Sequence, residues 1–161
     1  MKQKLLQIKQ KLKGCWRYLL IPLLGGAAVG IFSGGGMQTY ATLPKPPLSP
    51  PGWVFGVVWS ILYLCMGIAA CLVAKSDASG KKDALQLFWI QLAVNFIWSI
   101  LFFVWQMYGF AFLWLLLLWG LVAATLRKFW KIDKRAGWLL VPYLLWITFA
   151  AYLNGAIAFA M

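Results

Sequence analysis

The sequence predicts an all-α integral membrane protein that crosses the bilayer as a bundle of five transmembrane helices. Of its 161 residues, 63% are hydrophobic and only 11% are charged, whereas a soluble domain is roughly 45–50% apolar and about 25% charged. Four long segments contain no charged residue, namely 18–44, 46–74, 84–126 and 136–161. Because lipid offers the backbone no hydrogen-bond partner, apolar segments of this length must be helical.

The lengths of the uncharged segments give the number of spans. A helix needs roughly 20 apolar residues to cross the hydrocarbon core, so the segment 84–126 is long enough for two. Gln106 to Gly109 offer a short turn at its middle. We expect a basic N-terminal segment, 1–17, and a transmembrane domain, 18–161. The expected spans cover residues 19–37, 52–74, 84–105, 109–127 and 137–159.

The basic residues fall almost entirely on one side of the predicted membrane. Fourteen of the fifteen Lys and Arg lie in the N-terminal segment, the second loop or the fourth loop, and the exception is Lys45 in the first loop. Because Lys and Arg mark cytoplasmic loops, we expect a cytoplasmic N-terminus and an outside C-terminus, in the cytoplasmic membrane of a bacterium. These positions account for the net charge of +12, so no nucleic-acid partner is expected.

The composition excludes several kinds of chemistry. The chain contains no His, which excludes Ser-His-Asp and Cys-His catalysis and His-ligated metal sites. We expect no metal and no cofactor. Apart from Arg127 at the end of the fourth span, the predicted spans carry no Asp, Glu, Lys or Arg, which argues against a proton-coupled transporter. Cys15, Cys65 and Cys71 are odd in number and lack CxxC spacing, so no structural disulfide is expected.

The N-terminal segment has the pattern of a short amphipathic helix over residues 1–14. Its apolar residues Leu5, Ile8 and Leu12 are spaced three and four positions apart. The favoured interpretation is a topogenic tail that sets orientation. The alternative is a helix that lies on anionic membrane lipid, to which each Lys is attracted.

Three predicted helices carry aromatic and neutral polar side chains along one face. Residues three or four positions apart share a helix face. Two interpretations remain open: helix packing with amides as interhelical hydrogen-bonding groups, or a pocket with aromatic walls for a large, flat, apolar ligand. The faces consist of Phe55, Trp59 and Tyr63; of Gln91, Asn95, Trp98 and Phe102; and of Pro142, Trp146, Ala150 and Asn154.

Two further patterns have both a structural and a functional interpretation. The segment 43–53 contains five prolines, which hold the backbone extended and cannot continue a helix. It is either a plain connector or a stiff lid over the aromatic bundle. Gly26, Gly30 and Gly34 form a doubled GxxxG pattern, which favours close helix packing either inside the bundle or between two copies of the chain.

Three stretches resemble the motifs of the tryptophan-rich sensory protein family, whose eukaryotic members are the mitochondrial translocator proteins. They are the segment Leu48–Tyr63, which contains SPPGWVFGVVW, the segment Gln91–Trp98, which reads QLAVNFIW, and the segment Ala136–Asn154. The resemblance covers residues 20–159. It implies a five-helix bundle, commonly a homodimer, that binds porphyrins and other hydrophobic small molecules and acts in tetrapyrrole handling or stress sensing.

The resemblance also implies which residues form the ligand site. Residues matched by motif would form the pocket, and the first loop would close it. Together with their neighbours on the same helix faces, the candidate ligand-binding residues are Tyr40, Pro50, Pro51, Phe55, Trp59, Tyr63, Gln91, Asn95, Trp98, Trp146 and Ala150.

Family members also suggest two alternative functions. One is light-dependent porphyrin degradation, for which Trp59 and Trp146 would be the redox-active residues; the sequence offers no nucleophile or general base, so no other catalytic residue is assigned. The other is porphyrin transport. The chain departs from many members at Thr39 and Leu48, where they have Trp. No Lys or Arg follows Tyr152, so cholesterol recognition through the C-terminal motif of animal members is not expected.

The charge distribution generates a prediction about topology. An alkaline phosphatase fused after Met161 should be active, and a green fluorescent protein fused there should not fluoresce. The reason is that the C-terminal side of the last span lacks Lys and Arg and is therefore expected outside the cytoplasm. Paired fusions of an alkaline phosphatase and a green fluorescent protein measure this. Fluorescence without phosphatase activity would mean that the number of spans is wrong.

Overall fold

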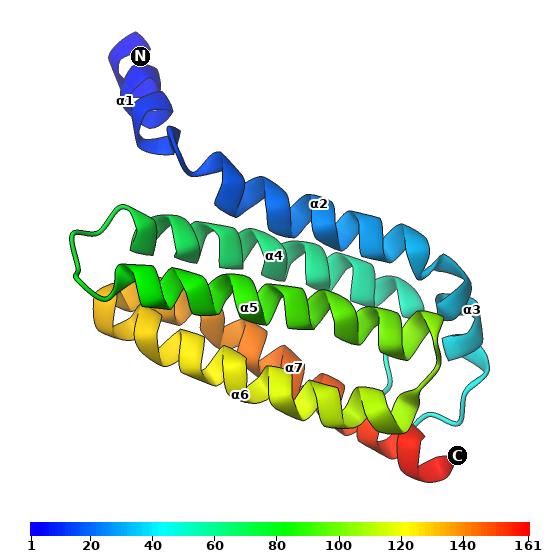
Figure 1. Ribbon diagram of the computed structural model, residues 1–161. Coiled ribbons are helices and arrows are strands. Elements are labelled where there is room, and N and C mark those ends of the chain that lie inside the picture. The colour runs from blue at the N-terminus through cyan, green and yellow to red at the C-terminus, as the bar shows by residue number, and fades with distance from the viewer.

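The computed structural model describes the backbone of residues 1–161 and all side chains except those of Ile8, Lys11 and Leu12. Among the described residues, four helices are long and apolar enough to cross a membrane, and a bent pair passes the same test together as a fifth span. The predicted all-α membrane bundle is thus confirmed (Figure 1). The four helices are α4 (Gly52–Ala74), α5 (Lys81–Ser99), α6 (Tyr108–Ile132) and α7 (Lys134–Ala160), and the pair is α2 (Trp16–Phe32) with α3 (Gly34–Thr42).

A short helix, α1 (Lys2–Leu12), precedes the bundle and projects away from it in Figure 1. The chain turns between α1 and α2 at Gly14, whose φ of +94° lies in the left-handed region that glycine adopts without strain. The predicted N-terminal helix is therefore present. Leu5 on its predicted apolar face is exposed, while the side chains of Ile8 and Leu12 lie outside the described residues.

The first span differs from the straight helix expected over 19–37. Helices α2 and α3 meet at Ser33 and are bent by 61°. The residues after the bend are three glycines, each about 1 kcal/mol less favourable than Ala in a helix. A Cβ on Gly36 would lie 2.1 Å from the carbonyl oxygen of Phe103. The bend therefore lets α3 pack directly on the backbone of the π-helical segment η1 (Ile100–Val104).

The turn predicted at 106–109 separates two helices as expected. The N–H of Trp105 donates to the carbonyl oxygen of Ile100 at 2.9 Å, which is the widened spacing of a π-helix. Gln106 then adopts a φ of 55°, and α6 begins at Tyr108. Phe103 of η1 lies against Tyr40 of α3, with their ring centroids 6.5 Å apart.

The expectation that the cysteines form no disulfide is wrong. Cys15 and Cys71 are joined, with their Cα atoms 5.3 Å apart. The physical reason is the close approach of α2 to α4, because a Cβ on Gly67 would lie 2.5 Å from the carbonyl oxygen of Tyr18. This contact brings the start of α2 beside the last turns of α4. Cys65 is a free, half-buried thiol.

The bundle has a basic end and a nearly uncharged end. The starts of α2, α5 and α7 and the ends of α4 and α6 lie together near α1, and α3 lies at the opposite end with the C-terminus (Figure 1). The basic segments predicted to share one side of the membrane thus share one end of the molecule. Lys45 follows α3 at the other end.

The doubled GxxxG pattern is divided between two environments. A Cβ on Gly26 would lie 2.3 Å from the ring of Tyr63, and a Cβ on Gly25 would lie 2.5 Å from Phe96. No described atom lies within 4 Å of the corresponding positions on Gly30 and Gly34. The first part of the pattern therefore packs within the bundle, and the second part is open.

This division predicts that two substitutions on the same helix differ in their effect on stability. Gly26→Leu should lower the free energy of unfolding by about 1–3 kcal/mol, because extra side-chain volume cannot fit against Tyr63. Gly30→Leu should not lower it, because the position is open and Leu is the better helix former. Thermal unfolding of both variants in detergent measures the difference, and equal losses would show that Gly30 is also packed.

Candidate ligand-binding site

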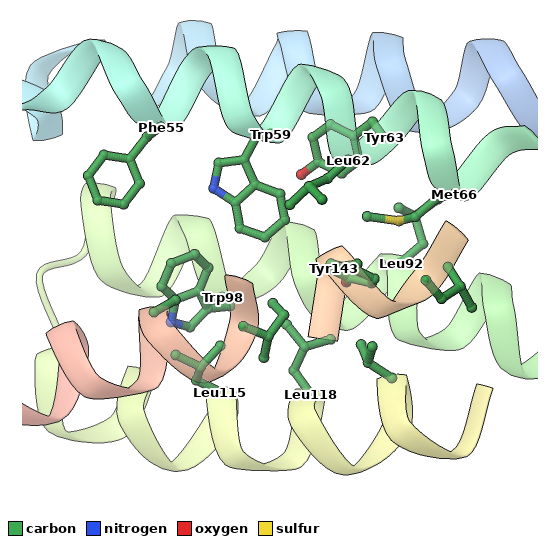
Figure 2. Packing of buried hydrophobic residues seen from close by; sticks show 14 of the residues in the cluster. Phe55, Trp59, Leu62, Tyr63, Met66, Leu92, Trp98, Leu115, Leu118 and Tyr143 are labelled. Carbon is green, nitrogen blue, oxygen red and sulfur yellow. The ribbon is translucent and has the colours of Figure 1, made fainter. Parts of the chain in front are cut away.

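The aromatic face predicted for α4 is buried along its length. Phe55, Trp59 and Tyr63 all point from α4 toward the interior (Figure 2). The rings of Trp59 and Tyr63 are stacked, with centroids 5.5 Å apart. The Trp59 ring also lies 6.1 Å from Tyr143 of α7 and 6.2 Å from Trp98 of α5. The row on α4 therefore joins the aromatic side chains of three helices.

A chain of hydrogen bonds runs beneath these rings and connects the same three helices. The hydroxyl of Tyr63 donates to Oδ1 of Asn95 at 3.1 Å, and Nδ2 of Asn95 donates to the hydroxyl oxygen of Tyr143 at 2.6 Å. The Tyr143 hydroxyl in turn donates to Oε1 of Gln91 at 2.7 Å. These amides have the interhelical role that the packing interpretation predicted.

A second polar link lies nearer the uncharged end. The indole N–H of Trp98 donates to Oδ1 of Asn154 at 3.1 Å. Nδ2 of Asn154 donates to the backbone carbonyl of Tyr108 at 2.9 Å. Trp98 and Asn154 are almost completely buried, so their hydrogen bonds hold α5, α7 and the start of α6 together.

The face predicted for α7 is only partly correct. Ala150 and Asn154 are buried as expected, but Pro142 is exposed and Trp146 is half-buried. The buried face runs through Tyr143, Ile147, Ala150, Asn154 and Ile157. The predicted set repeats strictly every four residues, whereas a helix turns every 3.6 residues, so a strict repeat of four drifts off the buried face.

The candidate residues line separate spaces. A cavity of about 210 Å³ lies between α2, α4 and η1, and Phe55, Trp59 and Tyr63 line it on the α4 side. A groove of about 510 Å³ lies between α4 and α7 and includes Trp146. Gln91 and Asn95 line neither space, because the hydrogen-bond chain holds them in the interior.

Most of the remaining candidate residues meet around Phe55. A void of only about 10 Å³ lies among Tyr40, Phe55, Trp98 and Ala150, together with neighbouring side chains of η1 and α7. The Phe55 ring contacts Tyr40 at 5.2 Å and Trp146 at 5.7 Å between centroids. The predicted residues do come together here, and their own rings fill the space.

The proline-rich segment is held across the uncharged end at two points. The Tyr40 hydroxyl donates to the carbonyl oxygen of Pro50 at 3.3 Å, and the Tyr152 hydroxyl donates to that of Pro47 at 3.0 Å. Pro50 is half-buried, while Pro51 is exposed and directly precedes α4. This attachment holds the segment beside the aromatic cluster of Tyr40, Phe55, Trp59, Tyr63 and Trp98. Both the connector and the lid interpretation are compatible with it.

Two buried polar atoms at the site have no hydrogen-bond partner among the described residues. They are the indole nitrogen of Trp146 and the hydroxyl oxygen of Ser33. Ser33 lies at the bend between α2 and α3 and lines the 210 Å³ cavity. An unpaired buried donor costs about 1–3 kcal/mol, so these atoms are available to a polar group of a bound molecule.

Comparison with known proteins decides the family. A family model described as the TspO/MBR family matches residues 18–160. The chain belongs to the TspO/MBR family. The translocator protein of Ovis aries is 40% identical over 141 residues, covering 85% of this chain and 83% of that protein. Protein CrtK of Rhodobacter capsulatus is 40% identical over 139 residues, covering 85% and 86%. The tryptophan-rich sensory protein of Cereibacter sphaeroides is 42% identical over 117 residues, covering 73% of each chain.

Membership in the TspO/MBR family confirms the resemblance inferred from the three motifs. The site of this family member also contains residues that sequence reasoning missed. Tyr143, the centre of the hydrogen-bond chain, lies eleven positions before Asn154, which is about three helical turns on the same face. That spacing was a usable signal. No comparable signal identified Ser33, whose position depends on the bend between α2 and α3.

The hydrogen-bond chain generates a prediction for stability. Tyr143→Phe should lower the free energy of unfolding by about 1–3 kcal/mol, because it leaves Oε1 of Gln91 without its donor and Nδ2 of Asn95 without its acceptor. Denaturant unfolding in detergent measures the loss. The matched control is Tyr152→Phe on the same helix, which removes only an exposed hydrogen bond to Pro47. Similar losses in both variants would contradict the central role of the chain.

Proposed function

We propose that this TspO/MBR family member binds porphyrins and other flat hydrophobic molecules at its aromatic cluster, and that it acts in tetrapyrrole handling or stress sensing. The relatives named translocator protein and tryptophan-rich sensory protein support a membrane role of this sensory or translocator kind. The observation that carries the proposal is the aromatic row of α4. It lines an interior cavity with three ring systems and no charged group.

Ring surfaces suit a porphyrin because a flat macrocycle can stack on them over a large area. Aromatic side chains prefer offset stacked or edge-to-face contacts, each worth about 0.5–1.5 kcal/mol beyond the burial of area. Phe55 already makes such a contact with Trp146, and Trp59 makes one with Tyr63. A bound ring would replace contacts of this kind between protein side chains, so the site favours shape and stacking over charge.

The size of the cavity indicates that binding requires an opening movement. Its volume of about 210 Å³ is below the roughly 300–1,000 Å³ of usual ligand pockets. Helix α2 forms the wall that faces Trp59, and a Cβ on its Gly30 would meet no described atom within 4 Å. Outward displacement of this part of α2 would enlarge the cavity without breaking the hydrogen bonds among α4, α5 and α7.

The unpaired donors supply orientation for a ligand. The carboxylates of a porphyrin are strong hydrogen-bond acceptors, and the indole N–H of Trp146 and the hydroxyl of Ser33 lack acceptors among the described residues. A ligand that satisfies them removes an existing cost. This supports inclusion of Trp146 in the site, although its ring faces the groove between α4 and α7.

A second candidate function is light-dependent degradation of the porphyrin. It is favoured by the contact of Trp59 with three other oxidisable rings, those of Tyr63, Tyr143 and Trp98, at 5.5–6.2 Å. Trp59 could donate an electron to a porphyrin excited by light. The radical left on Trp59 could then pass to the neighbouring Tyr and Trp rings. The bound porphyrin would then lose its absorption spectrum only in light.

We also propose that the chain lies in the bacterial cytoplasmic membrane with its basic end in the cytoplasm. The separation of the basic and uncharged ends supports this orientation. A homodimer formed through the open part of α2 and α3 is a further part of the proposal. Because Gly30 also lines the ligand cavity, a second copy at this face would cover the cavity.

The unpaired indole gives a specific test of ligand binding. Trp146→Phe should not lower the free energy of unfolding through a lost hydrogen bond, because the N–H that it removes is buried and has no partner among the described residues. It should weaken the binding of protoporphyrin by about 0.5–1.5 kcal/mol, the usual net value of one hydrogen bond. Titration of the purified protein in the dark, followed by porphyrin absorbance, measures the change.

The matched control is Trp130→Phe, which alters a half-buried Trp at the basic end of α6 that packs against Trp138. It should leave porphyrin affinity unchanged. Equal weakening in both variants would contradict a site at Trp146. The same titration under illumination tests the second function. Degradation would be identified if the wild-type protein destroyed the porphyrin spectrum in light and the Trp59→Phe variant did not.

A further inference from the structure

A separate cavity lies at the basic end of the bundle, far along α2 from the aromatic cluster. It measures about 330 Å³ and is lined by Arg17, Tyr18 and Ile21 of α2 and by Trp89 of α5. The rings of Tyr18 and Trp89 are stacked at 5.5 Å and form its aromatic wall. Unlike the other cavities described above, this one has a charged side chain in its wall.

Arg17 has no counter-ion among the described side chains. The chain has only three acidic residues, and the only ion pair among the described residues joins Asp133 to Arg135. The Arg17 side chain is exposed and makes no hydrogen bond among the described residues. A guanidinium group has five donors in a planar arrangement that matches a phosphate group in a two-point contact.

The residues of the cavity change in character with depth. Arg17 and Tyr18 lie near the start of α2, and Ile21 lies one turn farther into the bundle, at about 1.5 Å of rise per residue. A phosphate group could meet Arg17, the polar ester region could meet the Tyr18 hydroxyl and the Trp89 indole, and an acyl chain could follow the exposed Ile21. This order matches a phospholipid that enters from the side.

The surroundings favour a negatively charged molecule. The exposed Lys9 and Lys13 lie on and just after α1, close before Arg17 in the chain, and the exposed Lys82 lies in the first turn of α5. Basic pockets between transmembrane helices attract anionic headgroups. We propose that the cavity between α2 and α5 binds the headgroup of an anionic phospholipid, with Arg17 on its phosphate. A free phosphate would share that contact but would leave the Ile21 and Trp89 surface unused.

The test uses the full chain purified in detergent and counts bound lipid by native mass spectrometry. Phosphatidylglycerol should remain bound in preference to phosphatidylcholine. Arg17→Gln should weaken phosphatidylglycerol binding roughly fivefold, the factor that one basic residue contributes near an anionic surface. The matched control is Arg127→Gln, which removes the same charge from an exposed position on α6 at the same end and should leave the binding unchanged.

Three results would overturn the proposal. Equal retention of the two lipids would exclude an anionic headgroup site. Equal weakening by Arg17→Gln and Arg127→Gln would indicate general attraction to a basic end rather than a cavity. Displacement of phosphatidylglycerol by millimolar inorganic phosphate, at matched ionic strength, would identify a site for a soluble anion. The porphyrin titration of Arg17→Gln should be unchanged, so this proposal fails or stands independently of the aromatic site.

Discussion

The hydrogen-bond chain from Tyr63 through Asn95 and Tyr143 to Gln91 is the constraint on which the rest of the bundle depends. In lipid the hydrophobic effect does not favour one helix register over another, because an apolar side chain is equally well accommodated by lipid or by a neighbouring helix. Polar pairs do discriminate. A slip of α4 by one turn would bring Trp59 or Gly67 opposite Asn95, and Gly67 has no side chain to offer it. These hydrogen bonds thereby fix the register of α4, α5 and α7 relative to one another.

The first span is held by different means. Helix α2 contacts α4 closely at two glycines, Gly26 of α2 and Gly67 of α4. The disulfide of Cys15 and Cys71 fixes the start of α2. At Gly30 it has open space, and at the buried Ser33 it bends by 61° into α3. The cavity beside Trp59 lies where α2 stops packing closely against α4. A ligand cavity at this place therefore depends on two separate features. The hydrogen bonds fix the register of α4, α5 and α7, and α2 packs loosely at Gly30.

Much of the fold followed from the sequence because its signals were local. Charge-free segments gave the spans, and prolines and glycines gave the connections. The buried faces of α4 and α5 followed from helical spacing, including Phe55, Trp59 and Asn95. Failures occurred where the answer depended on packing between elements. The bend at Ser33 requires the contact of Gly36 with η1, and the disulfide requires the contact of Gly67 with α2.

The site was predicted as one pocket, whereas the structure places its aromatic residues around a cavity, a groove and a small void and leaves Gln91 and Asn95 outside all three. Motifs identify which side chains gather, since spacing places them on inward faces. They do not give the ring orientations that fill or leave space. Phe55 and Trp59 illustrate this limit, because both lie on the predicted face, yet Phe55 lines the cavity and the small void whereas Trp59 lines the cavity alone.

The positions of the two proposed sites along α2 bear on how the aromatic cavity can open. Pro22 lies between them and is buried, and it has no N–H to donate to the carbonyl of Tyr18, four positions earlier. That carbonyl instead lies against Gly67. The helix is thus fixed on the N-terminal side of Pro22 by the disulfide, and it lacks one backbone hydrogen bond at Pro22. An outward bend about Pro22 would therefore separate Gly25 and Gly26 from Phe96 and Tyr63 as it opened the cavity, but it would not shift the start of the helix. Arg17 and Tyr18 would keep their places while the cavity beside Trp59 widened, so the two sites can be occupied independently although they share one helix.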